Sequence, residues 1–198
     1  LDAGVDMIIH CIFKDEAGND EFREDVAERL GEQGTFINPT LHVPRSGIWV
    51  LQHKKAAEGL TQPEQRRLDE EQRQFEARME HCRRLIDMGL KVITGSDSSW
   101  GNYMLGNTVY EAECLVMAGL STMRGVMSVT SQAAAALGVD DEVGTLEPGK
   151  EADIIAVDGN PARNISDLWN VTDVMLAGEL IDRGSPRTLA AMRQPRPD

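Results

Sequence analysis

The chain has 198 residues, of which 41% are hydrophobic and 27% charged, and its formal net charge at pH 7 is −13. Such a chain can bury a core, but it lacks the basic patch that nucleic-acid binders carry, because the Arg residues of 64–84 are interleaved with Glu and Asp. No stretch has the roughly 18 to 20 consecutive apolar residues of a membrane helix. We therefore expect a soluble protein with neither nucleic-acid nor membrane partners.

Strands and helices are expected to alternate along the first two thirds of the chain. Apolar, β-branched runs predict the strands, and apolar residues at helical spacing, closed by glycines, predict the helices. In chain order we expect a strand at 5–9, a helix within 11–34, a strand within 35–43, a long mixed connection over 44–65, a helix at about 63–88, a strand at 90–94, and helices at 107–120 and 121–138. This order implies parallel strands with helical crossovers, in a barrel or a doubly wound sheet.

The pattern changes after Gly138. Turns at "EPGK" and "DGNP" flank an apolar run at 152–157, and two short strands surround "AGE" within 171–182. These features predict an antiparallel β module. The expected domains are a barrel-like part at 1–138, the β module at 139–184 and a surface tail at 185–198.

The three cysteines bear on the compartment. Cys11, Cys82 and Cys114 form no CxxC pair, and an odd, scattered set predicts reduced thiols and a cytoplasmic location. The first residues lack the pattern of a signal peptide. They read instead like the end of a helix with Gly4 as its stop, so we expect the chain to be part of something longer.

Polar side chains follow the predicted strands. His10 comes directly after the first strand, His42 follows the second, and Asp97 closes the third. The carboxyl ends of parallel strands gather at one face, and that face carries the chemistry of barrels and open sheets. A metal ion is one partner for such a carboxylate, and an Asp beside a hydrolytic metal also moves protons. Asp97 could equally form a turn or cap a helix, and His10 could be a core or loop residue.

Other candidates have plain structural interpretations. His53 and His81 lie in helical, charged surroundings and are predicted at the surface. Cys11, beside His10, is predicted to pack. The long connection is expected to cover the site, and Trp49 and Trp100 could line it or pack.

Several stretches resemble the metal-dependent amidohydrolases, in the branch of imidazolonepropionase-like and Xaa-Pro-dipeptidase-like enzymes. The matching segments are LDAGVDMIIHC (1–11), GTFINPTL (34–41), GLKVITGSD (89–97) and the long run 110–161. The resemblance implies the C-terminal part of a (β/α)8 TIM barrel, about strands 6–8, plus part of a small β-sandwich module. A typical barrel has ~250 residues, so the missing N-terminal half is expected on the same polypeptide or on another chain.

The resemblance also implies roles for individual residues. His10 matches the sixth-strand His, which is a metal ligand in two-metal members and contacts the water or the substrate in one-metal members. Asp97 matches the eighth-strand Asp, which is a metal ligand and the catalytic general base and acid. His42 would face the substrate. Three further positions are expected to be structural: Glu111, Lys150 and Asp153.

The implied function is hydrolysis of a C–N bond in an amide, cyclic amide or dipeptide by a metal-activated water, with one or two divalent ions and zinc as the default. The partners would be a small-molecule substrate and the missing barrel half, with a homo-oligomer also open. The sequence holds no His-x-His, and two ligands are fewer than the roughly three of a catalytic zinc site. The alternative is therefore a non-catalytic or degenerate scaffold without a full metal site. A dinucleotide-binding protein is disfavoured because GxGxxG is absent.

Overall fold

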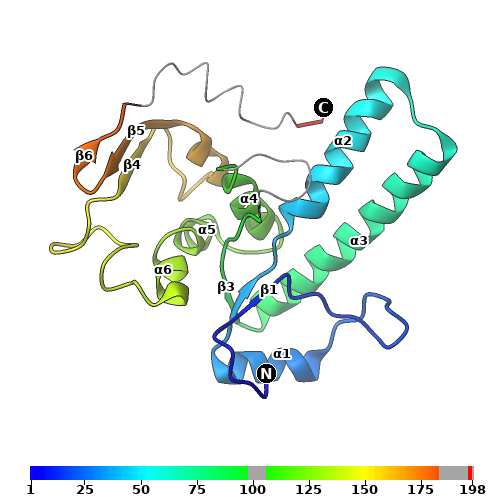
Figure 1. The fold of residues 1–198 in the computed structure, drawn as a ribbon, viewed down its shortest axis with the longest axis horizontal. Helices are drawn as coiled ribbons and strands as arrows, with labels where there is room; N and C mark the ends of the chain where they lie inside the picture. The colour runs from blue at the N-terminus through cyan, green and yellow to red at the C-terminus, as the bar shows by residue number, and fades with distance from the viewer. Residues whose placement is uncertain (98–105, 183–195, 198) are drawn as a thin grey trace.

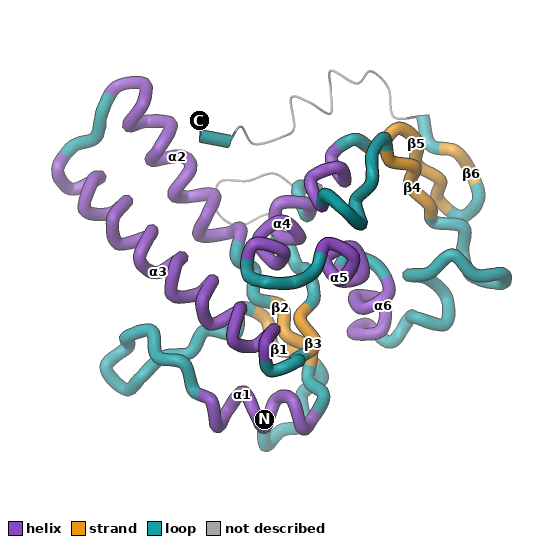
Figure 2. Tube along the Cα trace, turned by 180° about the vertical axis from the view of Figure 1, so that it is seen from behind, coloured by secondary structure: helices purple, strands orange, loops and turns teal. Residues whose placement is uncertain are grey.

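The computed structural model describes residues 1–97, 106–182 and 196–197. Its first sheet contains three parallel strands in the order β1 (Met7–Ile9), β2 (Phe36–Asn38) and β3 (Lys91–Val92). The chain is drawn in Figure 1, and Figure 2 labels all three strands. Further ladder bonds run from the backbone N–H of His10 to Asn38 O and from that of Ile93 to Ile37 O, both at 2.8 Å. The predicted parallel arrangement is confirmed, whereas the places of these strands in a complete barrel stay a prediction.

Helices connect the strands of this sheet. Helix α1 (Glu24–Gln33) joins β1 to β2, and the pair α2 (His42–Glu58) and α3 (Gln62–Asp87) joins β2 to β3. The two long helices lie side by side and project away from the sheet (Figure 1 and Figure 2). Helix α3 begins with a capping box, in which Thr61 Oγ1 accepts from Glu64 N and the Glu64 carboxylate accepts from Thr61 N.

The long connection predicted over 44–65 is wrong, because most of it is helix α2. Pro44 suggested a break, but it lies in the first turn, where its missing N–H has no intrahelical partner to lose. Ile48 and Leu51, one turn apart, pack against Leu68 of α3. Tertiary packing therefore makes a helix of a segment whose local pattern is mixed.

The single helix predicted at 121–138 is also wrong, since two helices occupy this range. Helix α4 (Val109–Met117) is followed by α5 (Thr122–Ser128) and α6 (Ser131–Leu137). The hydroxyls of Ser128 and Thr130 donate to the carbonyls of Gly125 and Val126, at 2.7 and 2.9 Å. Such side-chain bonds compete with the helical ladder, and they mark the break between α5 and α6.

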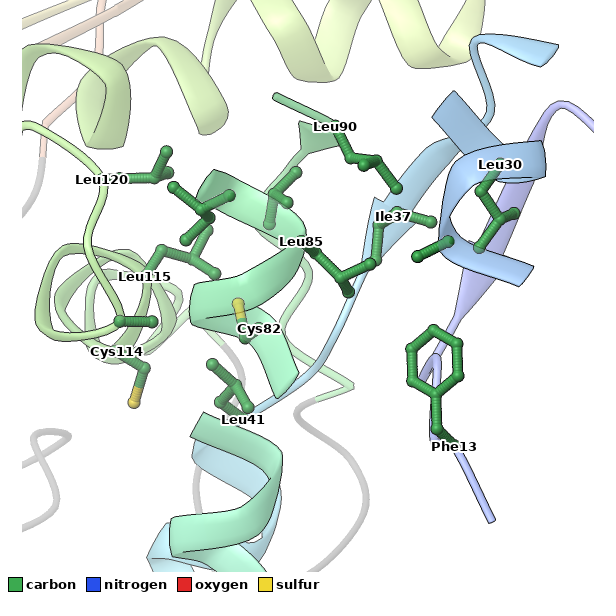
Figure 3. Close-up of a cluster of buried hydrophobic side chains, with 14 residues drawn as sticks. Phe13, Leu30, Ile37, Leu41, Cys82, Leu85, Leu90, Cys114, Leu115 and Leu120 are labelled. Atoms are coloured by element: carbon green, nitrogen blue, oxygen red, sulfur yellow. The ribbon is translucent and has the colours of Figure 1, made fainter. Parts of the chain in front are cut away.

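The main core joins one face of the sheet to the helices that pack on it. Figure 3 shows Leu30 of α1, Ile37 of β2 and Leu85 of α3 in one cluster with Leu115 of α4. Each of these four side chains is at most 1% exposed. Burying a leucine or isoleucine side chain stabilises the fold by about 1.5–3 kcal/mol, so this cluster fixes the strands and their ends relative to α3 and α4.

The C-terminal part is the antiparallel sheet that the turn pattern predicted. Strands β4 (Ile154–Val157), β5 (Val171–Leu176) and β6 (Glu179–Leu180) pair in that order. The short helix η1 (Ile165–Trp169) packs Ile165 and Leu168 against Ala112 of α4. The sandwich arrangement and the boundary at 138/139 stay predictions, and most of the predicted surface tail lies outside the described residues.

The helices were also compared with the requirements of a membrane span. In the ranges given above, no helix combines the length and the apolar character needed to cross a bilayer.

Candidate active site

A pocket lies at the carboxyl ends of the parallel strands. It has a volume of about 490 Å³ and is lined by His10, Thr40, Val43, Arg78 and Asp97. Three of these residues follow β1, β2 and β3 in turn. The sheet therefore gathers its strand ends at one place, which is where parallel α/β proteins carry their chemistry.

The backbone turns sharply at these strand ends. Among the residues that the structure describes, five non-glycine residues have positive φ, and four of them are His10 (71°), Cys11 (33°), Thr40 (50°) and Asp97 (45°). A non-glycine residue in the left-handed region costs of order 1–3 kcal/mol, and such residues cluster at active sites. The strain concentrated here favours a functional role for this edge of the sheet.

The imidazole of His10 is held between two side chains. Its Nδ1 lies 2.7 Å from Thr40 Oγ1, a hydrogen bond, and its Nε2 lies 3.9 Å from Asp97 Oδ2. The His10 and Asp97 side chains are 51% and 37% exposed, so both reach the pocket. Because Thr40 occupies Nδ1, Nε2 is the nitrogen that remains for chemistry beside the Asp97 carboxylate.

Gly95 and Asn38 pack closely together beside the turn that carries Asp97. A Cβ at Gly95 would lie 1.8 Å from Asn38 Nδ2, so a side chain at 95 would displace Asn38. The Asn38 Oδ1 is buried and has no hydrogen-bond partner within the described ranges. Glycine at 95 thus lets the end of β2 approach the turn that carries Asp97.

Glu111 of α4 fixes the turn that carries Thr40. Its Oε1 accepts from Leu41 N at 2.8 Å and its Oε2 from His42 N at 2.6 Å, which satisfies two donors at the start of α2. The side chain is 1% exposed. Burial raises the pKa of Glu111 to about 7, against the lowering effect of the two backbone donors. This geometry is in keeping with the structural role expected of Glu111.

His42 lies elsewhere than the sequence suggested. Its side chain is fully buried, and its ring stacks on Tyr110 with centroids 4.5 Å apart. Trp49 packs edge-on to His42 at 5.2 Å. His42, predicted to face the substrate, therefore lies in the core and does not line the pocket. Trp49 also packs in the core and does not line the pocket. Trp100 lies outside the described residues.

His81 and Cys11 both lie against the interior of the protein. His81 was predicted at the surface, which is wrong, because it is 8% exposed and lies edge-on to Phe13 with centroids 5.8 Å apart. Cys11 packs against the main core, as expected. Burial raises the pKa of the Cys11 thiol to about 11, which keeps it protonated near neutral pH.

Thr40 and Arg78 are pocket residues that the sequence did not identify. The motif "NPTL" contained Thr40, but nothing in the sequence indicated that its hydroxyl would bind His10. Arg78 belongs to a helix rich in alternating charges, and nothing in the sequence distinguishes it from the other arginines of that helix.

The pocket contributes two possible metal donors, an imidazole nitrogen of His10 and a carboxylate of Asp97. This donor chemistry suits zinc and related divalent ions. Within the described residues no group of three His, Cys, Asp or Glu side chains could hold a metal, and the segment 98–105 contains none of these types. The pair fits part of a metal site, and the described residues supply no third ligand beside it.

Comparisons with known proteins identify the family of the chain. The model of the amidohydrolase family matches residues 2–181. A 5-methylthioadenosine/S-adenosylhomocysteine deaminase of Teredinibacter turnerae is 28% identical over 131 residues, which cover 56% of this chain and 29% of that protein. Among solved structures, a Xaa-Pro dipeptidase with bound methionine has a TM-score of 0.71 and 28% identity, over 91% of this chain and 41% of that one.

A further structure supports the fold alone. The A. niger ochratoxinase has a TM-score of 0.64 and 24% identity, over 90% of this chain and 37% of that one. The chain thus spans less than half the length of each of these relatives. The family match extends over nearly the whole chain and includes the strand ends that form the pocket. The chain therefore belongs to the amidohydrolase family.

Proposed function

We propose that the protein containing this chain is a metal-dependent hydrolase that cleaves a C–N bond in an amide or dipeptide. The observation that carries the proposal is the approach of His10 Nε2 to Asp97 Oδ2, 3.9 Å, in a pocket at the strand ends. Similarity to a dipeptidase and to a deaminase supports C–N chemistry, since both names denote cleavage of carbon–nitrogen bonds.

Each pocket residue has a task in this proposal. When bound, a divalent metal, with zinc as the default, supplies the Lewis acidity that makes water a nucleophile near neutral pH. His10 would hold the ion through Nε2, and Thr40 would keep Nδ1 protonated and the ring in place. Asp97 would hold the ion with its carboxylate, take a proton from the attacking water and deliver it to the leaving nitrogen.

The remaining ligands are proposed to lie on the rest of the polypeptide or on a partner chain. A zinc site takes about three protein ligands, and the described residues bring two together. The same count motivates the alternative, a degenerate scaffold that binds no metal. The two proposals differ in a quantity that can be measured directly, the metal content of the complete protein.

The complete native polypeptide should contain at least one equivalent of divalent metal by elemental analysis after purification. A chelator should abolish hydrolysis of a panel of amides and dipeptides, and added Zn²⁺ should restore it. The chelator should also lower the unfolding midpoint, because an ion that binds only the folded state stabilises it. Absence of stoichiometric metal, with a midpoint that the chelator leaves unchanged, would favour the scaffold.

Thr40→Val should weaken metal binding by about tenfold, because hydrogen bonds to ligating histidines typically contribute 10–100-fold to affinity. Valine keeps the shape of the threonine side chain and removes its hydroxyl. Thr40→Ser keeps the hydroxyl and should therefore retain most of the wild-type metal affinity. The measurement is competitive zinc titration of the complete, metal-free protein with a chelating dye. Equal affinities of the wild type and Thr40→Val would contradict the role of the Thr40 hydroxyl.

A cytoplasmic location is retained as part of the proposal. Cys11, Cys82 and Cys114 are all free thiols in the structure. Burial raises the pKa of Cys114 to about 12, so its thiol is neutral, and its Sγ accepts a hydrogen bond from Arg45 Nη1 at 3.1 Å. Free, buried thiols are typical of proteins in a reducing compartment.

A further inference from the structure

Arg78 of α3 lines the same pocket as His10 and Asp97. The residue is half-buried, and its Nε has no accessible surface and no hydrogen-bond partner within the described residues. A buried donor of a charged group that lacks an acceptor costs free energy, so native arginines in such positions normally meet an anion. The neighbours of Arg78 therefore decide what that anion is.

Other arginines of α3 form ion pairs with carboxylates of the same helix. Arg67 binds Glu71 at 2.6 Å, and Arg83 binds both Glu80 and Asp87 at 2.6 Å. These partners lie three or four residues away, where side chains of one helix face meet.

Arg78 has no carboxylate at those spacings. The residues three and four positions away are Gln74, Phe75, His81 and Cys82. In the parts of the chain that the structure describes, no ion pair joins Arg78 to an Asp or Glu of another element. The segments 98–105 and 183–195 contain no Asp or Glu at all. The helix thus carries a cation into the pocket without bringing an anion for it.

The chemistry of the guanidinium limits the choice of anion. Its planar fork of N–H donors matches a carboxylate, which it binds with two parallel hydrogen bonds. The Asp97 carboxylate in the same pocket faces His10. The open volume beside Arg78 is therefore suited to a carboxylate that arrives with a ligand.

We propose that Arg78 binds a free carboxylate of the substrate. This inference rests on the proposed hydrolase function and narrows it. The substrates would be amides that carry a carboxylate, such as dipeptides and N-acyl amino acids, in preference to neutral amides. Arg78 is then a specificity-determining residue, which orients the substrate while His10 and Asp97 serve the reacting bond.

The test compares a carboxylate substrate with its neutral analogue on the complete, metal-loaded protein. The pair is the dipeptide that the substrate panel shows to be cleaved fastest and the same dipeptide as its C-terminal amide. Arg78→Gln should lower kcat/KM for the dipeptide by about 10²-fold, which is the effect expected when a charge-assisted hydrogen-bonded pair is lost. The same variant should change kcat/KM for the dipeptide amide by less than about threefold. Arg78→Lys should retain part of the preference, because it keeps the charge and loses the fork.

A matched control and a binding readout complete the experiment. Arg66→Gln removes an exposed arginine of the same helix outside the pocket and should leave both substrates unaffected. Calorimetric titration of the metal-free protein should show that the dipeptide binds more tightly than its amide in the wild type and equally in Arg78→Gln.

Two outcomes separate the inference from the proposed function. If Arg78→Gln lowers the unfolding midpoint and impairs both substrates equally, Arg78 pairs with a carboxylate of the rest of the protein, and the inference is overturned. If the metal-loaded wild type cleaves no amide, the hydrolase proposal fails. The titration of the metal-free protein then still decides whether Arg78 recognises a carboxylate.

Discussion

Asp97→Asn should lower kcat/KM for amide hydrolysis by at least about 10³-fold in the complete protein, because it removes both a metal ligand and the group that moves the proton. The fold should survive the change. Asparagine has the same shape as aspartate, and it tolerates the left-handed conformation that position 97 adopts, with φ of 45°. The unfolding midpoint should therefore stay close to that of the wild type when both are measured without metal.

Asp158→Asn is the matched control for this experiment. Asp158 also follows a strand directly, β4, but it is exposed and lies in the antiparallel sheet rather than at the pocket. Substitution there should leave activity, metal content and midpoint unchanged. Hydrolysis by Asp97→Asn at the wild-type rate would remove Asp97 from the mechanism, and an equal loss in both variants would point to a general effect on the protein.

The parts of the site that follow from topology could be predicted from the sequence. His10 and Asp97 each come at the end of an apolar run, and parallel pairing of those runs is enough to gather the ends. No knowledge of side-chain packing was needed for that step. The placement of His10 and Asp97 at the same edge of the sheet is thus a consequence of strand order.

Residues placed by helix packing could not be predicted in the same way. His81 has charged neighbours in the sequence, yet it is buried together with Cys82, the next residue, and Leu85, one helical turn later. Arg78 reaches the pocket because the packing of α3 beside α2 places it next to the strand ends. The burial of His42 depends on Tyr110, which lies 68 residues later in the chain. Contacts of this kind are set by tertiary structure and leave no local pattern.

Glu111→Gln should destabilise the protein by about 2–4 kcal/mol at pH 5, measured by urea denaturation. At pH 5 the buried carboxyl is protonated, and its two oxygens can both still accept from the backbone N–H groups at the start of α2. An amide has one oxygen and would turn its NH2 group towards the other donor. Glu142→Gln, which changes an exposed carboxylate, is the control and should have little effect. A loss in Glu111→Gln no larger than that of the control would contradict the role of Glu111 as the support of this turn.

The size of the Glu111→Gln effect should itself depend on pH. Burial raises the pKa of Glu111 from 4.5 to about 7 in the folded state. Between these values the folded protein keeps a proton that the unfolded chain has released, so the wild type loses stability as pH rises, by up to about 3 kcal/mol for a shift of this size. Glutamine does not titrate, so the difference between the two proteins should shrink from pH 5 to pH 8. Other carboxylates titrate in both proteins, so their contributions cancel in this difference. A difference in unfolding free energy that stays constant with pH would show that Glu111 is already ionised at pH 5.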